Sequence, residues 1–60
     1  MINNEISIAL KKWIMDWKKT YGDYPSFDEC LSWINWKFDD FIPSKNERDL
    51  IEEILKNIEN

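Results

Sequence analysis

The sequence has few of the residues that usually hold a small domain together. Among its 60 residues there is one cysteine, Cys30, and there is no histidine. A single cysteine excludes an internal disulfide bond, and a lone thiol cannot form a structural zinc site. Because a chain without disulfide bonds is typical of a reducing compartment, we expect a cytoplasmic protein that holds no metal and no cofactor.

Long apolar runs are also missing. A membrane-spanning helix needs roughly 18 consecutive apolar residues, and here charged residues interrupt every apolar run. Glu5 also breaks the pattern of a secretory signal peptide. We therefore expect no contact with a membrane. At this length we expect a single domain over residues 1–60.

Glycine and proline are scarce as well, and their positions divide the chain into three segments. Gly22 is the only glycine, and Pro25 and Pro43 are the only prolines. Each proline is followed by a serine, Ser26 or Ser44, with a glutamate three positions later. This spacing is typical of a capping box and predicts that a helix starts after each serine. The glycine is typical of the residue that follows the end of a helix.

Apolar residues recur at steps of three and four in each segment, as they do on one face of an α-helix. The stripe of the first segment consists of Ile6, Leu10, Trp13, Trp17 and Tyr21, with Ile2 and Ile14 beside it. The stripe of the second consists of Phe27, Leu31, Ile34, Phe38 and Phe41, with Cys30 and Ile42 beside it. The stripe of the third consists of Leu50, Ile51, Ile54, Leu55 and Ile58. Asn3 or Asn4 can cap the first helix. The sequence predicts an all-α, compact three-helix domain with helices at about residues 4–21, 27–41 and 45–58.

The second segment carries more apolar surface than one helix face can bury. Trp36 falls about 180° from the centre of its stripe, and Trp33 lies between the two faces. One interpretation is that the two neighbouring helices cover Trp36 as well. The other is that Trp36, together with Trp33, forms an exposed aromatic anchor, since tryptophan is enriched at binding hot spots.

Two apolar residues of the first segment also fall outside its stripe. Ile8 and Met15 are seven positions apart, on the face opposite Leu10 and Trp17. Scattered apolar side chains are normal on a protein surface. The alternative is that a homodimer through the first helix buries them.

The formal net charge of −4 is unevenly distributed: residues 1–22 carry +2 and residues 23–60 carry −6. An acidic body repels nucleic-acid phosphates and favours a partner protein with a basic surface. The candidate partner-binding residues are aromatic, acidic or apolar side chains outside the predicted core: Trp33, Trp36, Glu29, Asp39, Asp40, Glu47, Ile8 and Met15.

Patterns typical of catalysis are absent from the sequence. There is no glycine-rich phosphate loop and no nucleophile–base pair. The acidic pairs Asp39–Asp40 and Glu52–Glu53 are adjacent in sequence, so on a helix their side chains diverge by about 100° and do not converge on one ion. We expect Cys30 to be a buried, inert thiol, because its charged neighbours are acids. No catalytic residue is predicted, and we expect no enzymatic activity.

These patterns favour a small acidic module that binds a partner protein and inhibits or regulates it by occlusion. A phage- or plasmid-encoded inhibitor that mimics nucleic-acid charge is one form of this hypothesis. The alternative is a structural or regulatory homo-oligomer subunit that packs through its first helix. A helix-turn-helix DNA-binding regulator is less favoured, because residues 45–59, which would enter the major groove, carry a net charge of −2.

Overall fold

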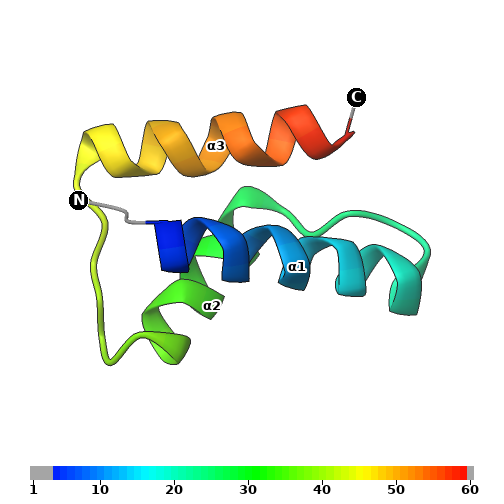
Figure 1. Cartoon of the computed structure of the whole chain (residues 1–60), viewed down its shortest axis with the longest axis horizontal. Helices are drawn as coiled ribbons and strands as arrows, with labels where there is room; N and C mark the ends of the chain where they lie inside the picture. Colours follow the sequence, from blue (N-terminus) through cyan, green and yellow to red (C-terminus); the bar gives the residue numbers. More distant parts are fainter. Residues whose placement is uncertain (1–3, 60) are drawn as a thin grey trace.

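The computed structural model describes residues 4–59, which form three α-helices and contain no strand. The helices are α1 (Asn4–Tyr21), α2 (Phe27–Lys37) and α3 (Lys45–Glu59), and each one contacts the other two. The two longer helices, α1 and α3, run in the same direction, while the shorter α2 crosses them and carries the chain back (Figure 1). The radius of gyration of 10.7 Å is close to the value of about 10.4 Å expected for a compact chain of this length. The predicted compact three-helix fold is therefore confirmed.

Both predicted capping boxes are present. The backbone N–H of Glu29 donates to Oγ of Ser26 over 3.2 Å, and Glu29 Oε1 accepts from the N–H of Ser26 over 3.0 Å. Ser44 and Glu47 repeat the same two hydrogen bonds over 3.3 and 2.9 Å. Each box satisfies two of the donors that a helix start leaves unpaired, which fixes where α2 and α3 begin.

The end of α1 also follows its sequence signal. Gly22 has φ +79°, a left-handed conformation that glycine adopts without strain, and its N–H donates to the carbonyl of Lys18 over 2.8 Å. The ammonium of Lys18 donates to the carbonyl of Gly22 over 2.8 Å and lies 5.0 Å from the ring centroid of Tyr24. Lys18 thus helps to close the first connection.

The end of α2 differs from the prediction. The helix ends at Lys37 rather than near residue 41, because Asp39 and Asp40 adopt φ values of +52° and +61°. The N–H of Asp40 reaches back over 2.9 Å to the carbonyl of Asn35, as in the Schellman ending of a helix. Glycine usually occupies such left-handed positions, whereas here two aspartates do. The two acids therefore lie beyond the helix and not within its last turn.

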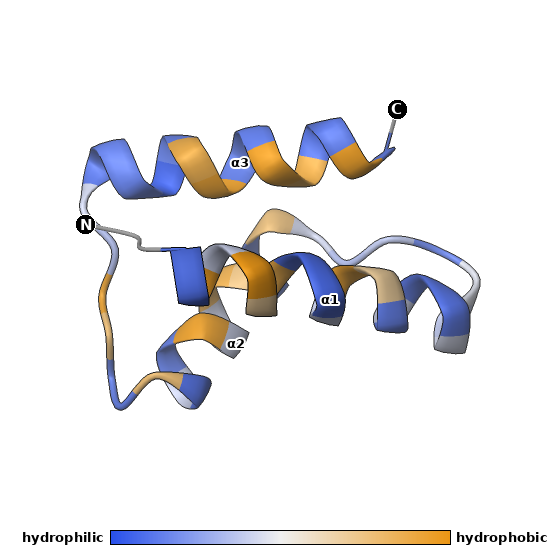
Figure 2. Cartoon of the chain, in the orientation of Figure 1, coloured by the Kyte–Doolittle hydropathy of each residue, from blue (hydrophilic) through white to orange (hydrophobic). Residues whose placement is uncertain are grey.

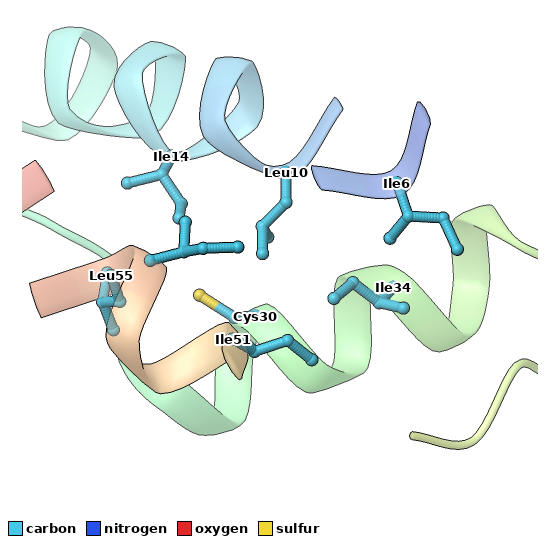
Figure 3. Packing of buried hydrophobic residues seen from close by; sticks show 8 residues of the cluster. Ile6, Leu10, Ile14, Cys30, Ile34, Ile51 and Leu55 are labelled. Carbon is cyan, nitrogen blue, oxygen red and sulfur yellow. The ribbon is translucent and has the colours of Figure 1, made fainter. Parts of the chain in front are cut away.

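The core is aliphatic, with one thiol. Its eight buried residues are Ile6, Leu10 and Ile14 from α1, Cys30 and Ile34 from α2, and Ile51, Ile54 and Leu55 from α3. Figure 3 shows side chains from all three helices converging on the same centre. In Figure 2 the hydrophobic residues of α3 face the other two helices and its hydrophilic residues face outward. Most of the aromatic residues lie around this core and are partly buried, whereas Tyr21 and Trp36 are exposed.

Two predicted core positions are wrong. Tyr21 and Leu50, expected within their stripes, are exposed, whereas Ile14 and Cys30, expected beside theirs, are fully buried. Because the helices cross, each one contributes only a short central patch of its stripe to the core. A residue at the end of a long stripe lies beyond the neighbouring helices and stays exposed. The predicted cap Asn3 and the flanking residue Ile2 lie outside the described residues.

The left-handed ending of α2 predicts opposite effects of two substitutions at residue 39. Asp39→Gly relieves backbone strain and removes a carboxylate from the negative end of the helix dipole. The free energy of unfolding should therefore stay level or rise by up to about 1 kcal/mol. Asp39→Val places a β-branched residue at positive φ and should lower it by about 1–2 kcal/mol. Urea unfolding followed by circular dichroism measures both. A valine variant as stable as the parent chain would show that α2 does not end in this way.

Candidate functional site

Trp36 is the most exposed of the large aromatic side chains on α2. Its exposed fraction is 76%, whereas Cys30 and Ile34 of the same helix are fully buried. The interpretation in which both neighbouring helices cover Trp36 is therefore wrong. Since α1 and α3 both pack on the side of α2 that carries Cys30 and Ile34, nothing in residues 4–59 encloses this indole ring.

Trp33 does not share that exposure. Its ring stacks on Trp13 of α1, with centroids 5.0 Å apart and an interplanar angle of 12°. The edge of Phe38 meets it at 6.0 Å and 90°. Such pairs stabilise a fold beyond the apolar area they bury, so the main contribution of Trp33 is to hold α1 against α2. The structure does not bring Trp33 and Trp36 together as one exposed anchor.

A second exposed apolar residue, which was not among the predicted binding residues, lies near Trp36 in sequence. Ile42, expected beside the stripe of the second helix, has an exposed fraction of 80%. The early end of α2 explains this position: Phe41 turns back toward the core, and its carbonyl accepts from the side-chain amide of Asn35 over 3.4 Å. Ile42, next in the chain, is left outside.

A hollow of about 290 Å³ lies between α2, this loop and α3. Its apolar lining comes from Leu31, Phe41, Ile42 and Pro43, and its polar lining from Ser32, Asn35 and Arg48. Trp36 directly follows Asn35 and lies one helical turn beyond Ser32. We refer to Trp36, Asp39, Asp40 and Ile42, together with this hollow, as the Trp36 surface.

The acidic residues of the predicted site fall into two groups. Asp39 and Asp40 are exposed in the turn that follows Trp36 and Lys37. Glu29 and Glu47 instead use their Oε1 atoms to cap the starts of α2 and α3. Glu29 also lies two helical turns, about 10 Å, from Trp36 along the axis of α2. Asp39 and Asp40 thus lie in the turn that begins shortly after Trp36, whereas the two glutamates have a capping role.

Ile8 and Met15 belong to a different surface. Both are exposed on α1, on the face opposite the buried Leu10. Lys11, Lys12 and Lys19 flank them on this face and are exposed as well. The outer face of α1 is therefore basic and apolar, in contrast to the acidic Trp36 surface.

Cys30 is buried in the core, as expected. Burial raises the pKa of its thiol to about 12, and the nearby carboxylates of Glu29 and Glu59 act in the same direction. A thiol that stays protonated at neutral pH is a poor nucleophile and a poor metal ligand. Within residues 4–59 no group of three or more cysteine, aspartate or glutamate side chains is placed to hold a metal ion.

None of the described helices is long and apolar enough to cross a membrane. Comparison of the chain with protein-family models, curated proteins and solved structures gives no match. We therefore infer a role for this chain from the geometry and chemistry of the Trp36 surface.

The different environments of the two indoles on α2 predict different costs of their removal. Trp33→Ala takes away a stacked, half-buried ring and should lower the free energy of unfolding by about 2–3 kcal/mol. Trp36→Ala removes an exposed ring and should change it by less than about 0.5 kcal/mol. Urea unfolding of the two variants under identical conditions measures both values. Equal losses would contradict the assignment of Trp36 to the surface.

The buried thiol predicts a stability change in alkaline solution. Because the folded state holds the Cys30 proton up to a pKa of about 12, the unfolded state releases it first, near its ordinary pKa of 9.0. The free energy of unfolding should therefore fall as the pH rises from about 9 towards 12. A Cys30→Ala variant, measured in parallel, should fall less steeply, since the other titrating groups are common to both chains. Parallel curves would contradict a buried, protonated thiol.

Proposed function

We propose that this chain is a small acidic protein-binding module that regulates or inhibits a partner protein by covering part of its surface. The observation that carries the proposal is the exposure of Trp36 on a chain of 60 residues, with an exposed Ile42 six positions later and a hollow lined by Ser32 and Asn35 of the same helix. Tryptophan is among the residues most enriched at binding hot spots. Neighbouring exposed apolar side chains on so small a domain are typical of an interaction site.

The aspartates beside Trp36 support a basic partner. Asp39 and Asp40 occupy left-handed positions that glycine would fill with less strain, and they lie at the negative end of the α2 dipole. Both features lower stability, and non-glycine residues with such backbone strain are concentrated at functional sites. Residues 23–60 also carry a net charge of −6, which attracts a basic surface at long range. A basic site that normally holds nucleic acid is one such surface, with the carboxylates in the place of phosphates.

The alternative, a homo-oligomer that packs through α1, has weaker support. Ile8 and Met15 are exposed, as that interface requires. In a symmetric dimer, however, the same face meets itself, so the lysines that flank the two apolar residues would lie close to their counterparts. Like charges in such an interface are unfavourable. This face favours an acidic neighbour over a second copy of itself.

Direct DNA binding has the least support. The exposed side of α3 carries Asp49, Glu52 and Glu53, and one of its three cations, Lys56, pairs with Glu52 over 3.5 Å. A helix with this charge is repelled by the phosphates that it would have to approach.

Affinity capture from the source cell, compared across matched variants, tests the proposal. The chain should retain one protein specifically. Trp36→Ala should weaken binding of that protein by about 30-fold, the effect of losing a hot-spot residue. Ile8→Ala removes an equally apolar exposed side chain from α1 and should leave binding unchanged. Asp39→Asn with Asp40→Asn should weaken binding most at low salt, where charge attraction is strongest.

Two results would contradict the Trp36 surface. A folded Trp36→Ala variant that keeps full affinity would show that the indole is not the anchor. Loss of binding or of self-association in the Ile8→Ala variant, with Trp36→Ala unaffected, would favour the alternative through α1. Circular dichroism of each variant confirms that its fold is intact.

A further inference from the structure

The hollow beside Trp36 combines an apolar lining with a cation that has no carboxylate partner among residues 4–59. Leu31, Phe41, Ile42 and Pro43 supply the apolar part. Arg48, the only arginine of the chain, lines the same hollow, and the described ion pair of α3 involves Lys56 and Glu52 instead. The guanidinium is therefore available to a ligand.

The remaining polar groups of the hollow fit a peptide backbone. The side-chain amide nitrogen of Asn35 donates to the carbonyl of Phe41, which leaves Oδ1 of Asn35 as an acceptor for an incoming N–H. The hydroxyl of Ser32 can donate or accept. A volume of about 290 Å³ is at the lower limit for ligand pockets, so the hollow suits one amino-acid residue and not a larger cofactor.

From this arrangement we infer that the hollow binds the C-terminal residue of the partner protein, an apolar residue with a free carboxylate. The apolar side chain packs against Leu31 and Ile42, the carboxylate pairs with Arg48, and the backbone N–H donates to Asn35. The fork of an arginine matches the two oxygens of a carboxylate. A chain terminus supplies that single carboxylate even when the partner is otherwise basic. The inference rests on the proposed function, since it names what the same surface binds.

The test uses two small probes that differ in one group. N-acetylleucine carries the apolar side chain, the N–H and the carboxylate, whereas in N-acetylleucinamide an uncharged amide replaces the carboxylate. In a ¹H–¹⁵N NMR titration, N-acetylleucine should shift the signals of Ser32, the Asn35 side-chain amide and Arg48, with a dissociation constant on the order of a few millimolar for a ligand of its size. N-acetylleucinamide should bind about three- to fivefold more weakly, because it cannot form the exposed ion pair with the guanidinium.

Variants distinguish the effect of the Arg48 guanidinium from that of positive charge elsewhere on the chain. Arg48→Gln should weaken binding of N-acetylleucine about three- to fivefold and abolish the preference for N-acetylleucine over the amide. Arg48→Lys should restore part of that preference. Lys12→Gln removes one exposed cation from α1 and should have no effect. Absence of localised shifts, or equal binding of the two probes, would overturn the inference. If capture of a partner still depends on Trp36 in that case, the proposed function stands and only the identity of the bound group is wrong.

Discussion

Helix α2 ends at Lys37, and the position of this end determines the shape of the surface around Trp36. Two aspartates in left-handed conformation stop the helix, and the carbonyl of Asn35 receives the N–H of Asp40. The chain then folds back, so that Phe41 packs against the core while Ile42 stays outside. Were the helix to continue for another turn, this loop would not lie against α2. The hollow beside Trp36 is thus a consequence of the way in which one short helix ends.

The aliphatic core explains why Trp36 stays uncovered. Three helices pack around Leu10, Ile34 and Ile51, and each one buries a single face. Residues 4–59 contain no fourth element that could cover the far side of α2. The aromatic rings at the edge, such as Trp13 and Trp33, gain stability by stacking on each other. Trp36 has no such neighbour within residues 4–59.

Local sequence signals made the starts of α2 and α3 predictable, but they did not specify where α2 ends. Ser26 and Ser44 act within four residues of their own positions, so a capping box can be recognised without any tertiary information. Phe38 and Phe41 continue the apolar spacing of α2 beyond its true end, and aspartate tolerates left-handed geometry without requiring it. Sequence periodicity therefore extended the helix to about residue 41.

The candidate site was predictable only in part, for a similar reason. The angular position of Trp36 on its helix indicated exposure, because it lies opposite the buried stripe. The role of Trp33 depends on Trp13 of another helix, and the hollow depends on Arg48 of a third. Such contacts follow from how the helices cross, which a single sequence does not specify.

Trp36 alone, among the four tryptophans, has its indole in open solvent. Broadening of the four indole N–H signals by a soluble paramagnetic agent measures this exposure directly in the intact chain. We expect the Trp36 signal to broaden most, well ahead of the signals of the partly buried Trp13, Trp17 and Trp33. Protection of Trp36 equal to that of Trp33 would contradict it, since the indole would then be enclosed and the surface built on it would not exist.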